Sequence, residues 1–242
     1  MRVLTLVLAV LAIAGMAQAD FLLDFGEAVA PAGQIPYGSE LPTRSPDPYQ
    51  GRYWNNVWTG GWASGDPNEV ASFSNLVDTT GAATGVSASV RGFTTDGTNG
   101  IAAQVLYPQS AQQDGVGCKH GEAPGIVTIS GLTEPEYTIR LFSSATTEKY
   151  YYNDDNRRTL FTVNGVSKIV HPYGNTDSVE SFYNVAPVDG TIAVEVTGAT
   201  PGGEETYSFG YLNVMELVVP EPATLSLLAL CALAVGRKHP RA

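Results

Sequence analysis

The body of the chain consists of short apolar, β-favouring runs separated by turn residues. Between Asp20 and Val218 no helical apolar period is sustained over about ten residues. The runs have the length of strands and are bounded by Gly, Asn, Asp and Pro. They predict strands at 21–25, 73–77, 86–93, 101–107, 126–130, 137–141, 160–163, 166–170, 191–196 and 209–219.

One pair of runs carries a specific hairpin signal. Asn164-Gly165 separates two β-favouring runs. Both central residues of a type I′ turn need positive φ, which Asn and Gly tolerate best. The sequence therefore predicts an antiparallel hairpin at this point.

Two further runs predict which side chains face the core. Ile192, Val194 and Val196 alternate with polar residues, so we expect them to point inward from one strand. The last run loses its alternation near Val214-Met215, where a β-bulge would fit.

About ten short strands with turn signals between them predict an all-β fold, a jelly-roll-type antiparallel β-sandwich formed by residues 20–218. The order of segments in the second half resembles malectin-like and galactose-binding-like β-sandwich domains. The resemblance covers roughly 125–218 and is carried by an alternating strand with an Arg at 137–142, RTLFTVNG at 158–165, VDGTI at 188–192 and GYLNVMEL at 210–217. It implies a sandwich that binds sugars.

The N-terminal end predicts a secretory signal peptide over residues 1–19. Met-Arg is followed by an apolar run, 3–16, which closes on Ala17-Gln18-Ala19. Small residues at Ala17 and Ala19 match the A-x-A pattern cut by signal peptidase, so cleavage is expected before Asp20. The alternative is an uncut N-terminal anchor, for which the apolar run is short.

The C-terminal end, 219–242, has three features in a fixed order. Pro220-Glu221-Pro222 precedes an apolar segment at 223–235, and a basic cluster follows it: Arg237, Lys238 and Arg241. As a helix the apolar segment would be about 20 Å long, a short span for a hydrocarbon core of about 30 Å. The basic residues would hold its end on the cytoplasmic side.

This order resembles the PEP-CTERM sorting signal. The resemblance implies recognition by an exosortase, a membrane-embedded cysteine transpeptidase that would cut near Pro220-Glu221-Pro222. It also implies transient anchoring in the inner membrane through the C-terminal helix. The final location would be the cell envelope, outer surface or extracellular matrix of a Gram-negative-type bacterium. The alternative is an ordinary C-terminal anchor in which Pro-Glu-Pro has no role.

Charge and cysteine content narrow the functional classes. All 24 acidic residues lie between Asp20 and Pro222, whereas four of the 13 basic residues lie in the two ends, so the body carries a net charge of −15. Such a surface disfavours nucleic acid and anionic polymers. Cys231 lies in the tail, which leaves Cys118 without a disulfide partner in the body and favours its burial.

An aromatic segment near the N-terminus is the first candidate ligand site. Aromatic faces beside amide and guanidinium donors suit sugar rings. Residues four apart on a strand share one side, so the tryptophans could form a stacking stripe, or they could fill the core instead. The candidates are Arg52, Trp54, Asn55, Asn56, Trp58 and Trp62.

A second aromatic loop, Tyr150-Tyr151-Tyr152, is followed by two acids and two arginines. Tyr151 is a candidate sugar contact, although a solvated loop tip explains the segment equally well. No cofactor is predicted. Structural calcium is conceivable at Asp154-Asp155 or near Asp96, yet neither matches an EF-hand spacing, and Asp96-Gly97 reads more simply as a turn.

No metal site or catalytic centre is predicted. Cys118-Lys119-His120-Gly121-Glu122 gathers a thiol, an imidazole and a carboxylate, but without a second ligand pair it reads as a Gly-rich loop. No Gly-x-Ser-x-Gly motif occurs.

We therefore expect a non-enzymatic exported sandwich, sorted to the envelope and able to bind extracellular polysaccharide. The expected processing partners are signal peptidase and an exosortase, and the only membrane contact is the C-terminal helix. The alternatives are a secreted carbohydrate-active hydrolase with a carboxylate pair and a purely structural matrix component.

Overall fold

A computed structural model describes residues 20–26, 43–44, 52–57, 70–97, 100–101, 105–113, 115–119, 121–146, 158–199 and 209–220. Within these ranges no helix is long and apolar enough to cross a membrane. The predicted signal peptide and most of the predicted sorting tail lie outside them. All described strands and all buried apolar clusters fall between Asp20 and Val219.

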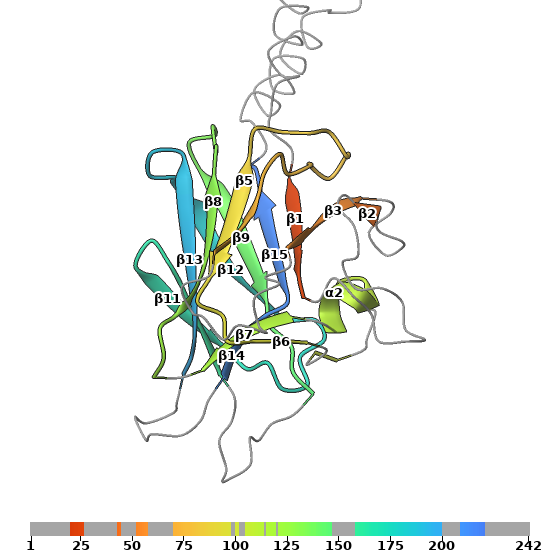
Figure 1. Cartoon of the computed structure of the whole chain (residues 1–242), viewed down its shortest axis with the longest axis vertical. Helices are drawn as coiled ribbons and strands as arrows, with labels where there is room; N and C mark the ends of the chain where they lie inside the picture. Colours follow the sequence, from red (N-terminus) through yellow and green to blue (C-terminus); the bar gives the residue numbers. More distant parts are fainter. Residues whose placement is uncertain are drawn as a thin grey trace, which may run out of the picture.

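Two six-stranded sheets form the layers of a sandwich (Figure 1). The first, here called the terminal sheet because it contains the first and last described strands, has the order β12-β9-β15-β1-β3-β2. Its pairs are antiparallel except β1 with β3, which is parallel. Its strands are β1 (Phe21–Phe25), β2 (Thr43–Arg44), β3 (Tyr53–Val57), β9 (Tyr137–Phe142), β12 (Val179–Val185) and β15 (Val214–Val218).

The second layer, here called the central sheet, is antiparallel throughout and has the order β11-β10-β13-β8-β5-β4. Its strands are β4 (Val70–Phe73), β5 (Ser87–Arg91), β8 (Gly125–Ser130), β10 (Thr159–Val163), β11 (Val166–Val170) and β13 (Thr191–Gly198). The fold is therefore an all-β, jelly-roll-like antiparallel sandwich, as the sequence predicts.

A third, three-stranded sheet closes one end of the sandwich (Figure 1). It has the order β14-β7-β6, formed by β14 (Phe209–Leu212), β7 (Gly115–Lys119) and β6 (Thr95–Gly97). The short helix α2 (Gln109–Gln113) lies beside the terminal sheet. The β-bulge predicted near Val214-Met215 is not found, because both residues pair in continuous register with β1 and β9. The run is interrupted one residue earlier, at Asn213, which separates β14 from β15 and lets the chain pass between sheets.

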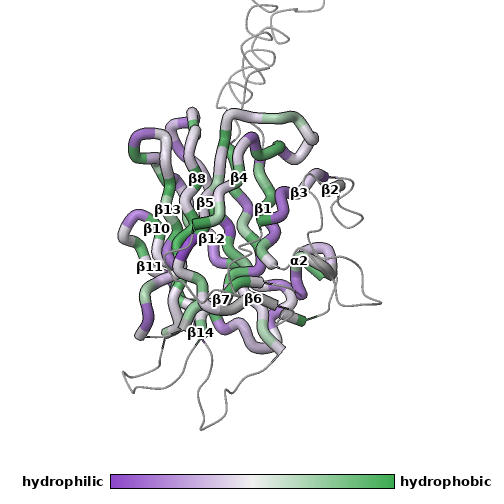
Figure 2. Tube along the Cα trace, in the orientation of Figure 1, coloured by the Kyte–Doolittle hydropathy of each residue, from purple (hydrophilic) through white to green (hydrophobic). Residues whose placement is uncertain are grey.

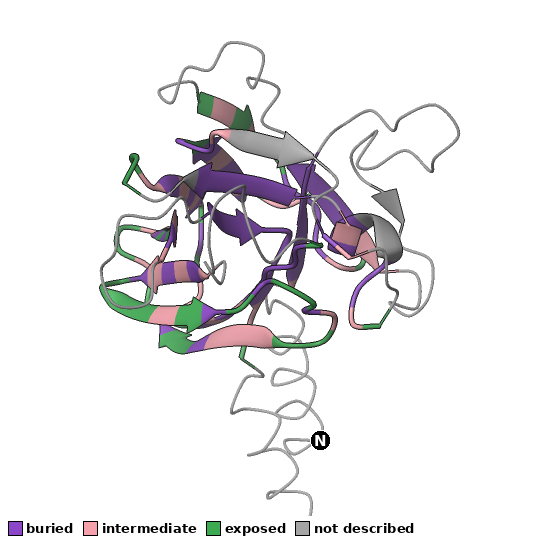
Figure 3. Ribbon diagram, turned by 90° about the horizontal axis from the view of Figure 1, so that it is seen from below, coloured by how far each residue is buried: buried purple, intermediate pink, exposed green. Residues whose placement is uncertain are grey.

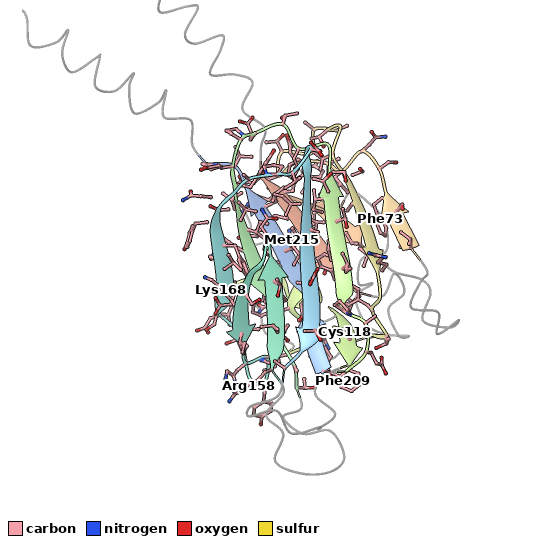
Figure 4. All side chains as sticks on the ribbon, turned by 90° about the vertical axis from the view of Figure 1, so that its left-hand side faces the viewer. Phe73, Cys118, Arg158, Lys168, Phe209 and Met215 are labelled. Atoms are coloured by element: carbon pink, nitrogen blue, oxygen red, sulfur yellow. The ribbon has the colours of Figure 1, made fainter. Side chains whose placement is uncertain are left out.

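The main core lies between the two six-stranded sheets. Alternation sends Ile192, Val194 and Val196 inward from β13, each with no exposed surface, as predicted. Met215 of β15 belongs to the same buried cluster and is labelled near the middle of the strands in Figure 4. Hydrophobic residues gather on the strands of this interior in Figure 2, and Figure 3 shows the buried residues concentrated there.

The predicted hairpin is confirmed. β10 pairs antiparallel with β11, and Asn164 and Gly165 have φ of 49° and 77°. These values match a turn that needs two left-handed residues. The predicted strands at 21–25, 126–130, 137–141 and 191–196 are also found, with ends that differ by a few residues at most.

Two predicted strands are wrong, and several strands were not foreseen. The predicted strand at 73–77 overlaps β4 only at Phe73, and Val77 forms an isolated bridge with Ala83 instead. Within 101–107 the described residues form bends that lead into α2, because the apolar side chains there pack on a sheet instead of joining one. Asp96-Gly97, predicted as a turn, lies in β6 and pairs with Val116 and Gly115. The strands β3, β7 and β12 were not predicted, because their Gly, Asn and Ser content masks their strand character.

The chain enters and leaves the sandwich at neighbouring points. Phe21 of β1 pairs with Leu217 of β15, which sets Asp20 beside the last residues of the final strand. The Val219 N–H donates a hydrogen bond to Asp20 Oδ1 at 3.0 Å, and the Thr79 N–H donates one to the Asp20 carbonyl at 2.9 Å. The predicted signal-cleavage point and the start of the predicted sorting motif therefore meet at one end of the fold.

Candidate functional site

The outer face of the terminal sheet presents an unusual row of side chains. Along β15 the residues Met215 and Leu217 point into the core, so Glu216 points outward. Glu216 stands opposite Arg140 of β9 on one side and Leu22 of β1 on the other. The row therefore puts the Glu216 carboxylate on β15, an inner strand of the terminal sheet, directly beside the Arg140 guanidinium.

Four side chains form a charge cluster on this face: Asp20, Arg52, Arg140 and Glu216. Arg140 Nη1 donates to Glu216 Oε2 at 2.6 Å. Arg52 approaches both acids, with Nη1 3.9 Å from Glu216 Oε1 and Nη2 3.8 Å from Asp20 Oδ2. The longer distances make Arg52 a looser ion-pair partner than Arg140.

Exposure differs sharply within the charge cluster. The Glu216 side chain is 3% exposed, whereas Arg140, Asp20 and Arg52 are 37%, 34% and 33% exposed. The Glu216 carboxylate is therefore the buried part of the cluster. The side chains of Arg52, Arg140 and Asp20 surround it and form a rim that reaches solvent. Burial raises the pKa of Glu216, and the charges of Arg140 and Arg52 partly oppose that rise.

An aromatic wall lies beside the charge cluster on the same face. Tyr107 contacts Trp54 and Phe142 edge-to-face, with ring centroids 6.0 Å and 5.2 Å apart. These rings pack with Leu22 and Val214 of the sheet in a second buried cluster. The segment that leads into α2 thus covers part of the outer face and leaves the charge cluster at its border.

Gln112 holds that covering segment in place. Its Oε1 accepts hydrogen bonds from the N–H groups of Val105 and Tyr107 at 3.0 and 3.3 Å. Its Nε2 donates to the Thr176 carbonyl at 2.8 Å. The side chain is fully buried, so these bonds replace the water that it gives up on folding.

The predicted aromatic segment is only partly described, and its described members lie next to this site. Trp54 is 3% exposed and belongs to the buried wall, so its ring is a packing surface and not an open stacking face. Asn55 is 2% exposed; it donates to the carbonyls of Leu22 and Val77 and accepts from the Val77 N–H. Asn56 is also buried, and Arg52 alone reaches solvent as a member of the charge cluster.

The remaining sequence-predicted candidates lie outside the described residues. These are Trp58, Trp62 and Tyr151 among the ligand contacts, Ala17 and Ala19 at the signal cleavage, and Glu221, Pro222, Arg237, Lys238 and Arg241 of the sorting motif. Pro220 is described and exposed, directly after Val219, whose N–H donates to Asp20 Oδ1. The stacking role of Trp58, Trp62 and Tyr151 stays a prediction.

The structure describes part of the segment around Cys118 that was considered as a reactive or metal-binding site. Cys118 lies in β7, near the lower end of the sandwich in Figure 4, and is fully buried. Its Sγ donates to the Val196 carbonyl at 2.8 Å, and burial raises its pKa to about 11. His120 lies outside the described residues, among which no group of three metal-ligating side chains occurs.

Sequence reasoning missed Arg140 and Glu216 as a functional pair. Each is the one charged residue of its strand, and that pattern is visible in the sequence. The pairing is not visible, because the two residues are 76 positions apart and meet only through the register of β9 with β15.

No protein family matches the chain, and no curated protein matches its sequence. Among solved structures, the carbohydrate-binding module TmCBM61 in complex with β-1,4-galactotriose is similar at 10% identity and a TM-score of 0.29, over 65% of this chain and 94% of that one. An exo-β-1,3-galactanase from Phanerochaete chrysosporium, solved with galactose, is similar at 17% identity and a TM-score of 0.27. That match covers 59% of this chain and 32% of the galactanase. Because both TM-scores are low, the fold assignment rests on the strand registers described above.

Proposed function

We propose that this chain is an exported, non-catalytic sugar-binding β-sandwich that is sorted to the cell envelope by its C-terminal tail. The sugar contact is the charge cluster of Asp20, Arg52, Arg140 and Glu216. The observation that carries the proposal is the pair of one-third-exposed guanidiniums fixed around a buried carboxylate on an outer sheet face.

This arrangement suits the chemistry of a sugar. Guanidinium groups present several N–H donors in one plane, and carboxylates accept hydrogen bonds, so together they match the donor and acceptor hydroxyls of a pyranose. The buried Glu216 fixes Arg140 in position before any ligand arrives, which lowers the entropy cost of binding. The predicted aromatic contacts Trp58 and Trp62 follow β3, the strand that begins one residue after Arg52.

Export and sorting rest on the two apolar ends. The adjacent exit points at Asp20 and Val219 support this part of the proposal, since a folded body with both ends on one side leaves its remaining surface away from the membrane. Mass spectrometry of the protein from its native host should find a mature chain that begins at Asp20 and lacks residues 237–242. An intact C-terminus in the surface fraction would contradict sorting by an exosortase.

Glycan-array binding of the segment 20–219, with a hydrolysis assay on the same preparation, tests the sugar site. The variant Arg52→Met removes a guanidinium that is 33% exposed and keeps an apolar side chain of similar length, so it should weaken binding by at least fivefold while the domain stays folded. Arg91→Met is the matched control, because Arg91 is exposed on β5 of the other sheet.

Three outcomes would oppose the proposal. Glycan release during incubation would favour the hydrolase alternative. No retention on any glycan would favour a purely structural matrix component. Equal weakening by Arg52→Met and Arg91→Met would show that binding does not use the charge cluster.

A further inference from the structure

The first residue of the predicted mature chain is part of the charge cluster. Asp20 precedes β1, and its carboxylate contacts both the Val219 N–H and Arg52. While the signal peptide is attached, the Asp20 nitrogen is an uncharged peptide N–H. Cleavage after Ala19 turns the same nitrogen into an ammonium group, whose ordinary pKa of about 7.7–8.0 keeps it charged at neutral pH.

This change alters the charge balance of the site. Before cleavage, Arg52 and Arg140 balance Asp20 and Glu216, so the formal charge of the cluster is zero. After cleavage, three cationic groups surround two carboxylates. The site then carries a net positive charge on a body whose net charge is strongly negative.

We infer that signal-peptide removal completes the site and makes it selective for sugars that carry a carboxylate, such as uronic acids. This inference rests on the proposed sugar site and names its ligand class. A guanidinium pairs with a carboxylate through two parallel hydrogen bonds, and Arg52, which is 33% exposed on the rim and lies 3.8 and 3.9 Å from Asp20 and Glu216, is placed to meet such a ligand. The negative net charge of the body repels acidic polymers in general. A local cationic site would therefore decide which acidic sugars bind.

The fold keeps the new ammonium group close to the cluster. The Asp20 carbonyl accepts the Thr79 N–H, and its carboxylate accepts the Val219 N–H, so both sides of the residue are fixed. The charged groups that face it among the described residues are its own carboxylate, Arg52 ahead of β3, Glu216 on β15 and Arg140 on β9. Glu136 lies two residues before Thr138, which pairs with Val218 of β15.

The test compares two forms of residues 20–219, which contain every described strand. One begins at Asp20 itself; the other carries Gly-Ala before Asp20, which moves the ammonium group away by two residues. Both are titrated with oligogalacturonate and with a neutral β-1,4-galactan oligosaccharide of equal length. We expect the form that begins at Asp20 to bind oligogalacturonate about fourfold more tightly, the effect of one unit charge at about 5 Å in water.

A pH series supplies the matched control. The fourfold difference between the two forms should disappear at about pH 10, where the terminal amine is neutral. Binding of the neutral oligosaccharide should be the same for both forms at every pH.

The remaining outcomes separate this inference from the proposed sugar site. If both forms bind both oligosaccharides equally, the charge inference is wrong while the sugar site stands. If neither oligosaccharide binds either form and the glycan array is also negative, the sugar site itself is wrong.

Discussion

Replacing Arg140 with Met should destabilise the domain strongly at neutral pH and only weakly in acid. Arg140 donates the 2.6 Å hydrogen bond to Glu216, whose side chain is 3% exposed. Removing one partner of a fully buried ion pair costs about 3–5 kcal/mol. Arg140 is 37% exposed and partly screened by water, so we expect about 2 kcal/mol. For a domain of this size that loss corresponds to a decrease in Tm of about 4–8 °C.

The pH dependence follows from Glu216. Burial already raises the pKa of this carboxyl in the folded state, and Arg140 is the first of the charges that oppose the rise. Without Arg140 the folded pKa rises further above the unfolded value of about 4.3. The folded variant then binds more protons than the unfolded chain, so its stability falls as pH rises from about 4 through the new folded pKa. Below pH 4 both states are protonated and the penalty is small.

Urea unfolding of residues 20–219 at pH 3.5 and pH 7 measures this difference. Arg140→Met with Glu216→Gln should lose the pH-dependent part of the penalty, because no carboxyl is left to ionise. Arg91→Met, an exposed control on β5, should change stability by less than about 0.5 kcal/mol at either pH. An equal penalty for Arg140→Met at both pH values would refute the assignment of the effect to a buried ionised Glu216.

Three further predictions test the packing of the domain. Val194→Ala, at a fully buried position between the sheets, should cost about 2–3 kcal/mol in the free energy of unfolding measured by urea denaturation. Asn55→Ala should cost about 2–3 kcal/mol in the same assay, because it leaves the buried carbonyls and the N–H that Asn55 bonds without that partner, and a loss below 0.5 kcal/mol would contradict this role. Cys118, with a pKa raised to about 11 by burial, should resist iodoacetamide at pH 8 until denaturant is added, as followed by intact-mass spectrometry; labelling of the native chain at the rate of a free thiol would show that β7 opens readily.

The sequence by itself determined the local features of this protein. Alternation placed Ile192, Val194 and Val196 in the core, and Asn164-Gly165 fixed a hairpin, because side-chain period and turn conformation depend only on neighbouring residues. Where tertiary packing overrides local pattern, the prediction was wrong or incomplete. The apolar residues near Tyr107 lie against a sheet and do not form a strand, and Asn55 is buried because it bonds backbone groups of two other segments.

Only the tertiary structure decided the candidate site. Asp20 and Val219 are 199 positions apart, and Arg140 and Glu216 are 76 apart, yet each pair is joined by a hydrogen bond. Their meeting depends on β15 lying between β1 and β9, a pairing that is set by the closure of the whole sandwich. No local periodicity encodes the register between distant strands, because that register is fixed by burying both inner faces at once.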